Sequence, residues 1–156
     1  MTTYLNYLGQ PIPQSADPTS SVTGNDPNGG EAWTAPTGPS SVQGGGGGDT
    51  LVGNTGDTTF IVTNPHDVVE ASPDSGTDTV VAYTSYTLPD NVQNLTVSND
   101  FNYAVGNSLD NLITVSGAQW VDGGAGNDVL VSGSGAAVFE EQIGQGNDVH
   151  VFNFQL

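Results

Sequence analysis

The sequence predicts an all-β fold, a right-handed parallel β-roll (β-solenoid) in which a short strand and a turn alternate every nine residues. Three observations predict it. Large apolar residues recur at a fixed interval of nine, glycine and aspartate fill the positions between them, and Gly and Pro are too abundant for a helical protein. The 35% hydrophobic content of the 156 residues allows only a thin core.

The apolar repeat forms two ladders, and each member is expected to point inward from its own strand while its neighbours point outward. The first ladder is Trp33, Val42, Leu51, Phe60 and Val69, and the second is Tyr103, Leu112, Val121, Leu130 and Phe139. Two nine-residue units then make one coil. Insertions break the period between Ala82 and Ala104, so the repeat register of that stretch stays open.

The expected turns are rich in glycine and aspartate. Residues 123–131 read Gly-Gly-Ala-Gly-Asn-Asp-Val-Leu-Val, and residues 44–52 read Gly-Gly-Gly-Gly-Gly-Asp-Thr-Leu-Val. Both match the pattern G-G-x-G-x-D-x-U-x at every defined position. Weaker copies occupy residues 53–61, 105–113, 132–140 and 143–151. On these motifs the sequence resembles the RTX, or haemolysin-type, calcium-binding repeat proteins of bacteria over about residues 26 to 151.

The resemblance implies calcium in the turns, with each ion held between successive coils on one edge. Glycine allows close backbone approach, aspartate supplies charge, and Ca²⁺ takes six to eight oxygen ligands. The candidate metal ligands are Asp49, Asp67, Asp78, Asp110, Asp128, Asp148, Asp57, Asp90, Gly45, Gly47, Gly124, Gly126, Gly144 and Gly146. The sequence offers no convincing catalytic constellation and no other cofactor site.

Spacing predicts that calcium gathers on one edge of the roll. Asp49 pairs with Asp67, and Asp110 with Asp128, at the spacing of two nine-residue units. Asp128 pairs with Asp148 at a slightly longer spacing, and Asp90 falls near the missing member. The opposite edge has Ser40, Thr58, Asp78, Gln119 and Ala137, with Asp57 displaced by one position. We therefore expect a calcium ladder of about three to five ions on one edge and an edge closed by hydrogen-bonded or small residues opposite it.

The charge balance limits the partners. The chain has 17 acidic residues and no Lys or Arg, which argues against binding nucleic acid or anionic membrane. It has no Cys, and His66 and His150 are interpreted as a turn residue and a cap residue, so a structural zinc site is not expected. Carboxylates on adjacent rungs, about 5 Å apart, repel by roughly 3 kcal/mol per pair at an effective dielectric of 20.

Three to five such pairs equal the stability of a typical domain, about 5–15 kcal/mol. Folding is therefore expected to require calcium. The family resemblance implies export of the unfolded chain by the type I route and folding outside the cell, so the protein is predicted to be secreted and extracellular or attached to the surface of a bacterium.

We divide the chain into a Pro-, Ser- and Gly-rich tail or capping arm, residues 1–25, and a roll with a C-terminal edge strand or cap, residues 26–156. Apolar residues at outward positions predict self-association through a face formed by Ile113, Val131 and Val151, through the N-terminal arm, or through the C-terminal strand.

Two functions remain open, and neither is an enzyme. The first is a calcium-hardened, self-assembling structural component of an extracellular filament, surface layer or matrix. The second is an accessory or carbohydrate-binding module associated with a secreted polysaccharide-degrading enzyme, in which Trp120 contacts sugar. These 156 residues hold no catalytic domain and begin with Met, which favours the first function.

Overall fold

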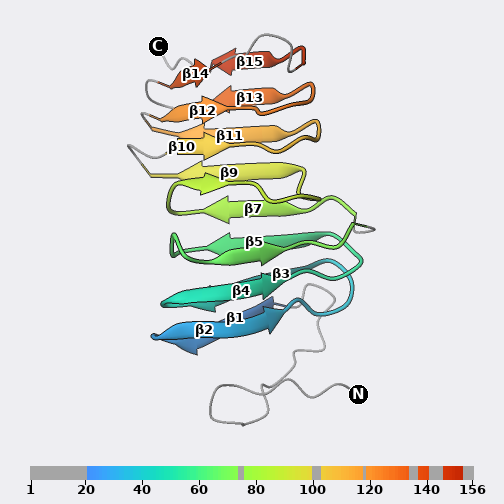
Figure 1. Ribbon diagram of the computed structural model, residues 1–156, viewed down its shortest axis with the longest axis vertical. Helices are drawn as coiled ribbons and strands as arrows, with labels where there is room; N and C mark the ends of the chain where they lie inside the picture. Colours follow the sequence, from blue (N-terminus) through green and yellow to red (C-terminus); the bar gives the residue numbers. More distant parts are fainter. Residues whose placement is uncertain are drawn as a thin grey trace.

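The computed structural model describes residues 21–73, 76–99, 103–117, 119–133, 137–140 and 146–152. These residues form 15 β-strands and no helix, so none of them belongs to a helix able to cross a membrane. The strands pair in parallel and stack as successive coils along one long axis (Figure 1). The prediction of an all-β parallel solenoid is confirmed.

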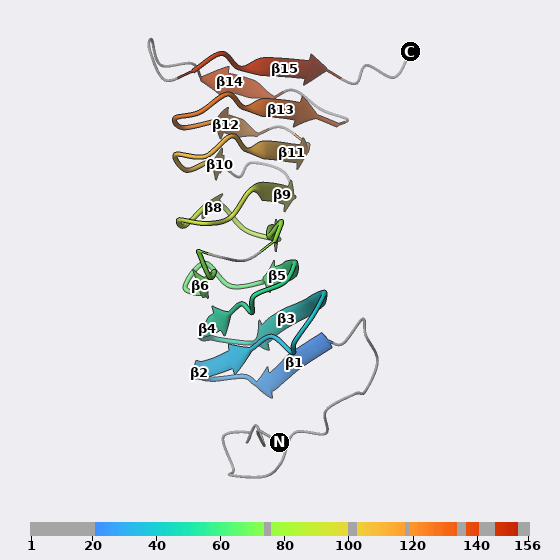
Figure 2. The ribbon, with the colours of Figure 1, turned by 90° about the vertical axis from the view of Figure 1, so that its right-hand side faces the viewer.

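One face of the solenoid is an eight-stranded parallel sheet made of every second strand, which we call the large sheet (Figure 2). Its strands, in order, are β1 (Ser21–Asp26), β3 (Ser40–Gly45), β5 (Thr58–Val62), β7 (Thr79–Ala82), β9 (Asn94–Ser98), β11 (Leu112–Ser116), β13 (Val129–Ser132) and β15 (Val149–Phe152). The first strand, β1, straddles the boundary drawn at residue 26, and it pairs with β3.

The opposite face is divided into two shorter parallel sheets. The first contains β2 (Gly29–Thr34), β4 (Gly48–Val52) and β6 (Val68–Glu70). The second contains β8 (Tyr86–Thr87), β10 (Tyr103–Val105), β12 (Trp120–Asp122) and β14 (Val138–Glu140). Since the chain alternates between the two faces, each coil contributes one strand to each side, and the turns form two edges.

The core is one cluster of apolar side chains between the two faces. All five members of the first ladder, Trp33 to Val69, are buried, and Val42, Leu51 and Phe60 have no exposed surface. Alternation in the strands produces this cluster, because β3 and β5 bury every second residue. The first apolar ladder is therefore confirmed.

The second ladder is wrong at its first two members. Tyr103 and Leu112 are 48% and 43% exposed, whereas the residues that follow them, Ala104 and Ile113, are fully buried. Ile113 pairs with Leu130, and this spacing is one position shorter than two nine-residue units. Val121 and Leu130 are buried as predicted, and Phe139 is packed against the core.

The irregular stretch contains a shortened coil, since Val80 pairs directly with Leu95. Leu88 and Val92 are buried there and continue the core. The strand β8 pairs with β10 and not with β6, which leaves the break between the two short sheets. The Tyr86 hydroxyl is hydrogen-bonded to the backbone of Val69 across this break, and burial raises the pKa of Tyr86 to about 12.

The predicted association face is also shifted by one position. Ile113 is buried, so it cannot lie on that face, while Val151 is exposed and Val131 is partly exposed. The outward apolar column of the large sheet is instead Leu112, Val129 and Val149, which are in register on neighbouring strands.

The core ends at an aromatic group near the C-terminus. His150 is in register with Leu130, and its ring stacks on Phe139 with the ring centroids 4.6 Å apart. Phe152 packs edge-on against Phe139 at 5.1 Å. His150 therefore covers the end of the core among the described residues, as its prediction as a cap residue required.

The shift of the inward position can be tested with two neighbouring alanine variants. Ile113→Ala removes a fully buried side chain and should lower the free energy of unfolding in calcium by about 2–5 kcal/mol. Leu112→Ala removes an exposed side chain and should cost about 0.5 kcal/mol or less. Urea unfolding measures both, and a larger loss for Leu112→Ala would contradict this register.

Candidate metal sites on the solenoid edges

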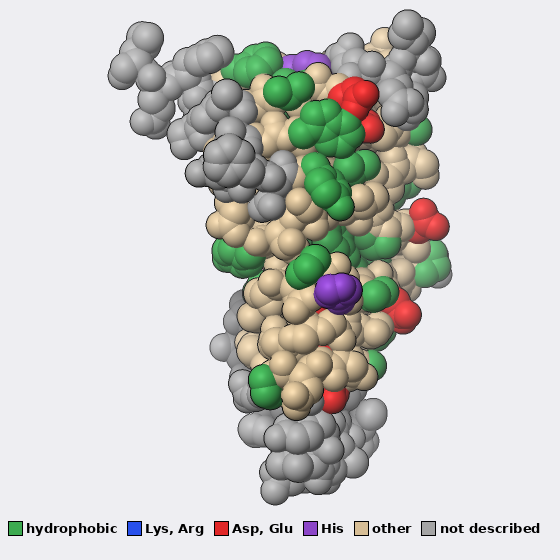
Figure 3. All heavy atoms as spheres, turned by 60° about the vertical axis from the view of Figure 1, so that its left-hand side comes forward, with side chains coloured by type: hydrophobic (Ala, Val, Ile, Leu, Met, Phe, Trp, Pro, Cys, Tyr) green, Lys and Arg blue, Asp and Glu red, His purple; other side chains and the backbone are tan. Residues whose placement is uncertain are grey.

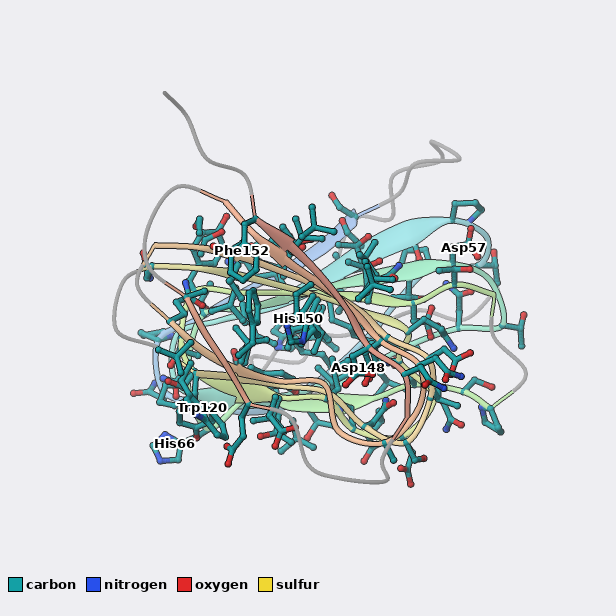
Figure 4. The ribbon with its side chains drawn as sticks, turned by 90° about the horizontal axis from the view of Figure 1, so that it is seen from above. Asp57, His66, Trp120, Asp148, His150 and Phe152 are labelled. Carbon is teal, nitrogen blue, oxygen red and sulfur yellow. The ribbon has the colours of Figure 1, made fainter. Side chains whose placement is uncertain are left out.

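The turns form two edges, which we name after a buried aspartate on each. The Asp49 edge precedes the strands of the short sheets and carries Glu31, Asp49, Asp67 and Gln119. The Asp128 edge precedes the strands of the large sheet and carries Ser40, Thr58, Asp78, Gln93, Asn111, Asp128 and Asp148. Seen along the solenoid axis, Asp57 lies on one side and His66 on the opposite side (Figure 4).

The expected one-sided aspartate ladder is therefore wrong. Asp49 lies at the start of β4 and Asp67 precedes β6, both in a short sheet, whereas Asp128 and Asp148 precede strands of the large sheet. Five strands separate Asp67 from Asp110, an odd number, which moves the later aspartates to the opposite edge.

The edge opposite Asp49 was predicted correctly only in the N-terminal half. Ser40, Thr58 and Asp78 lie opposite Asp49 as expected. Gln119 was expected beside them, but it precedes β12 and therefore lies on the Asp49 edge. The odd number of strands between the two halves explains both the misplaced aspartates and the misplaced Gln119.

A buried aspartate on either edge accepts the backbone N–H of the preceding coil. Asp49 Oδ1 accepts from Glu31 N at 3.2 Å, and Asp67 Oδ1 accepts from Asp49 N at 3.1 Å. On the other edge, Asp128 Oδ1 accepts from Asn111 N at 2.8 Å. One oxygen of each carboxylate is thus committed to holding two coils together.

The same bond recurs at both ends of the Asp128 edge. Thr58 N donates to Asp78 Oδ1 at 2.7 Å, and Asp128 N donates to Asp148 Oδ1 at 2.9 Å. Because buried N–H groups require acceptors, these aspartates have a structural role that is independent of any metal.

The second carboxylate oxygen separates the aspartates into two kinds. Asp67 Oδ2 accepts from Thr63 N and Asn64 N, both at 3.1 Å. In contrast, Asp49 Oδ2 and Asp128 Oδ2 are buried and have no hydrogen-bond partner among the described residues. A buried carboxylate oxygen without a partner carries a large desolvation cost, and these two belong to the two perfect nonapeptides.

The glycines beside these oxygens leave room for them. A Cβ on Gly44 would collide with Asp49 Oδ2, and a Cβ on Gly123 would collide with Asp128 Oδ2. Backbone oxygens of the preceding coil also approach closely, because a Cβ on Gly47 would meet Asn28 O and one on Gly124 would meet Asn107 O. The turns are therefore lined with carboxylate and carbonyl oxygens.

The predicted glycines adopt conformations that suit glycine best. Positive φ angles occur at Gly45, Gly47, Gly124, Gly126 and Gly146. Side chains at such angles are strained, so the motif requires glycine for its backbone as well as for space. Gly144 lies outside the described residues.

Negative charge is concentrated around Asp128. Burial raises the pKa of Asp128 to about 6, the hydrogen bond from Asn111 opposes this, and the charges of Asp148, Asp110 and Asp122 add to the increase. No Lys or Arg exists in the chain to offset these carboxylates. A bound cation would favour the charged carboxylate and so oppose this increase in pKa.

The other predicted ligands lie differently. Asp110 is exposed, and its Oδ1 accepts from Asn127 N at 2.8 Å, while the adjacent Asn111 occupies the buried position. Asp57 is exposed and accepts from Thr77 N at 2.7 Å. Asp90 is exposed in the turn before β9.

In the part of the chain that the structure describes, no three Asp, Glu or His side chains converge on one point. Any ion bound there would therefore rely on backbone carbonyls. An all-oxygen set containing one carboxylate fits a hard cation such as Ca²⁺ and gives no nitrogen or sulfur ligand for zinc.

Four edge residues were missed by the sequence analysis: Gln93, Asn54, Asn107 and Asn111. Asp78 N donates to Gln93 Oε1 at 2.7 Å, so an amide takes the position of an aspartate. Asn111 uses Oδ1 to accept from Asn107 N at 2.8 Å. The pair Gly-Asn at 53–54 and again at 106–107 was a sequence signal for such turns.

The fold and its edges define a class: a parallel β-solenoid whose Gly- and Asp-rich turns present oxygen ligands. No family model matches the chain, and no solved structure matches it. Two curated proteins of Rhizobium meliloti (strain 1021) are similar to it. Endo-1,3-1,4-beta-glycanase ExsH is 36% identical over 115 residues, which cover 71% of this chain and 24% of the glycanase.

Endo-1,3-1,4-beta-glycanase EglC is 34% identical over 65 residues, which cover 42% of this chain and 14% of that protein. The chain thus corresponds to about a quarter or less of the length of the curated relatives it matches. The similarity connects this solenoid with a portion of each of two glycanases.

The charge around Asp128 predicts the pH dependence of the calcium-free chain. Because its pKa is raised from 3.8 to about 6 in the folded state, folding is favoured at low pH, and that contribution is lost as the pH rises through about 6. Circular dichroism of calcium-stripped protein should show more β structure at pH 4.5 than at pH 7. Asp128→Asn should reduce this difference, and an unchanged profile would refute the assignment.

Proposed function

We propose that this chain is a non-catalytic, calcium-binding β-solenoid module of an extracellular protein that acts on polysaccharide, and that calcium binding drives its folding. The observation that carries the proposal is the pair of buried carboxylate oxygens, Asp49 Oδ2 and Asp128 Oδ2, each without a hydrogen-bond partner in the described structure and each in a Gly-rich turn. The similarity to parts of two glycanases supports the polysaccharide context.

Calcium is the cation that best satisfies this environment. The donors are carboxylate and carbonyl oxygens, which are the ligands Ca²⁺ prefers. A divalent cation supplies the charge that a chain of formal net charge −17 lacks. Since the turns form only when the coils stack, binding free energy becomes folding free energy. The best-supported ions belong to the turns 44–49 and 123–128, and a total of three to five remains a prediction.

An extracellular location follows from the same reasoning. Extracellular calcium modules work at about 10⁻⁴ to 10⁻³ M, a range in which weak sites built from carbonyls fill. A chain that folds only there can leave a calcium-poor cytoplasm unfolded, which suits the type I route implied by the RTX resemblance.

Both imidazoles serve the fold, which supports a non-catalytic role. His66 Nδ1 lies 3.1 Å from Asn64 Oδ1 within an exposed turn. His150 stacks on Phe139 at the end of the core.

Calcium titrations of three variants test this proposal. Circular dichroism from chelator to about 10 mM calcium should show cooperative gain of β structure. Asp49→Asn and Asp128→Asn should each remove about one bound ion and raise the calcium midpoint, because each exchanges a carboxylate for a neutral amide of the same shape. Glu70→Gln changes an exposed carboxylate outside the candidate ligands and should behave as wild type. Native β structure in excess chelator at pH 7, or no calcium uptake, would refute the proposal.

A second candidate function, self-assembly as a structural component, is favoured by two exposed apolar columns in the C-terminal half. Leu112, Val129 and Val149 are in register on the large sheet and are 43%, 36% and 54% exposed. Tyr103, Trp120 and Val138 are in register on the opposite face and are all exposed. Figure 3 shows hydrophobic side chains gathered beside acidic ones over this half of the molecule.

One pair of measurements separates the two functions. We expect a monomer in sedimentation velocity at high calcium, together with binding to a mixed-linkage β-glycan that Trp120→Ala weakens, because an exposed aromatic column offers flat apolar surface to sugar rings. Calcium-dependent oligomers that Val129→Ser disperses, without glycan binding, would instead support the structural component.

A further inference from the structure

Two turns on the Asp128 edge are closed by an amide side chain placed after a glycine. Asn54 Nδ2 donates to three oxygens of the preceding turn: Gly38 O at 3.0 Å, Ser40 Oγ at 2.8 Å, and Pro36 O. Asn107 Nδ2 likewise donates to Pro89 O at 2.7 Å and Val92 O at 2.8 Å. In both turns, one NH₂ group gathers oxygens that the preceding coil presents.

The remaining bonds of the two turns also correspond. Asn54 Oδ1 accepts from Gly56 N, and Asn107 Oδ1 accepts from Leu109 N at 2.9 Å, so each amide oxygen closes its own turn. The backbone N–H of each Asn donates to the side chain four positions later, Thr58 Oγ1 at 3.4 Å and Asn111 Oδ1 at 2.8 Å. The same set of hydrogen bonds thus recurs in two turns that belong to different coils.

These asparagines occupy a position that is glycine in the perfect nonapeptides. Asn54 follows Gly53 and Asn107 follows Gly106, as Gly45 follows Gly44 and Gly124 follows Gly123. Four positions further on, Thr58 and Asn111 stand where Asp49 and Asp128 stand. Each of these four turns therefore has either the buried carboxylate or the asparagine after the glycine, and none has both.

We infer that Asn54 and Asn107 act as built-in replacements for a cation, so that the turns 53–58 and 106–111 close without calcium; this rests on the proposed calcium binding at turns 44–49 and 123–128. The NH₂ group presents two donors with partial positive charge to converging oxygens, as an ion would. The amide itself brings no net charge, and the carboxylates of these two turns, Asp57 and Asp110, are exposed to solvent instead of buried.

The Asp49 edge contains a related arrangement at Gln119. Its Nε2 donates to Asn99 O at 2.6 Å, to Val97 O at 3.4 Å and to Ser116 O. Like the two asparagines, this amide collects backbone oxygens of the preceding coil, Val97 O and Asn99 O, and it also contacts Ser116 O of its own turn. Amide closure therefore occurs on both edges, in turns that lie between the two Gly- and Asp-rich turns along the chain.

The test measures how many calcium ions are taken up on folding, from the slope of the logarithm of the folding constant against the logarithm of calcium concentration. Asn54→Ala and Asn107→Ala should each lower the folding constant about 10-fold by leaving buried oxygens without donors, with the slope unchanged. The exposed neighbours Thr55→Ala and Ser108→Ala are controls and should have little effect. A decreased slope for either Asn variant would overturn the inference, because that turn would then hold an ion.

The converse variant rewrites one amide turn as a calcium turn. Asn107→Gly combined with Leu109→Gly and Asn111→Asp gives residues 106–111 the pattern G-G-x-G-x-D. We expect the slope to increase by about one ion and the calcium midpoint to rise. A folded triple variant with an unchanged slope would overturn the inference.

The outcomes also distinguish this inference from the proposed function. A zero slope for the wild type would refute calcium-driven folding itself. In that case Asn54→Ala and Asn107→Ala would still report on amide closure through their loss of stability relative to Thr55→Ala and Ser108→Ala, and stability equal to that of these controls would overturn it.

Discussion

The constraint on which this solenoid depends is the need to satisfy buried polar atoms where the chain turns. Each coil brings backbone N–H groups and oxygens to the two edges, where a thin core leaves them little water. Aspartates such as Asp67 and Asp78 meet part of this need by accepting N–H groups from the preceding coil. The oxygens need donors, and the chain has no Lys or Arg to provide them.

Two solutions to the shortage of donors coexist in one chain. Asn54, Asn107 and Gln119 supply amide N–H groups to the oxygens of neighbouring turns. The turns that contain Asp49 and Asp128 keep a buried carboxylate oxygen without a donor among the described residues. The first solution is neutral and takes its donors from the protein itself, whereas the second requires a counter-charge from solution. On the Asp128 edge, the residue after the first glycine of the turn, Asn or Gly, distinguishes them.

The sequence predicted the fold well because the nine-residue period marks a recurring inward position in the strands, and Leu51 and Phe60 occupy it. It failed where the period drifts: Ile113 lies one position too close to its partner Leu130, so the inward position passes from Leu112 to Ile113. Because the coil between Val80 and Leu95 is shortened, the number of strands between two distant residues cannot be counted from their separation in the sequence. A solenoid tolerates changes in the length of its turns at little energetic cost. The edge on which each aspartate lies therefore could not be derived from the spacing of the aspartates in the sequence.

The positions of the two Gly- and Asp-rich turns determine which coils calcium can stabilise directly. The turn 44–49 lies near the N-terminal end of the described solenoid and on one edge, and the turn 123–128 lies near the C-terminal end and on the other. In a solenoid each coil is stabilised mainly by its neighbours. Coils between these turns carry amide closures and gain less from calcium directly. Calcium would then act chiefly by stabilising the outer coils, where stacking is incomplete, while the amide turns of the middle close without a buried carboxylate oxygen that lacks a donor.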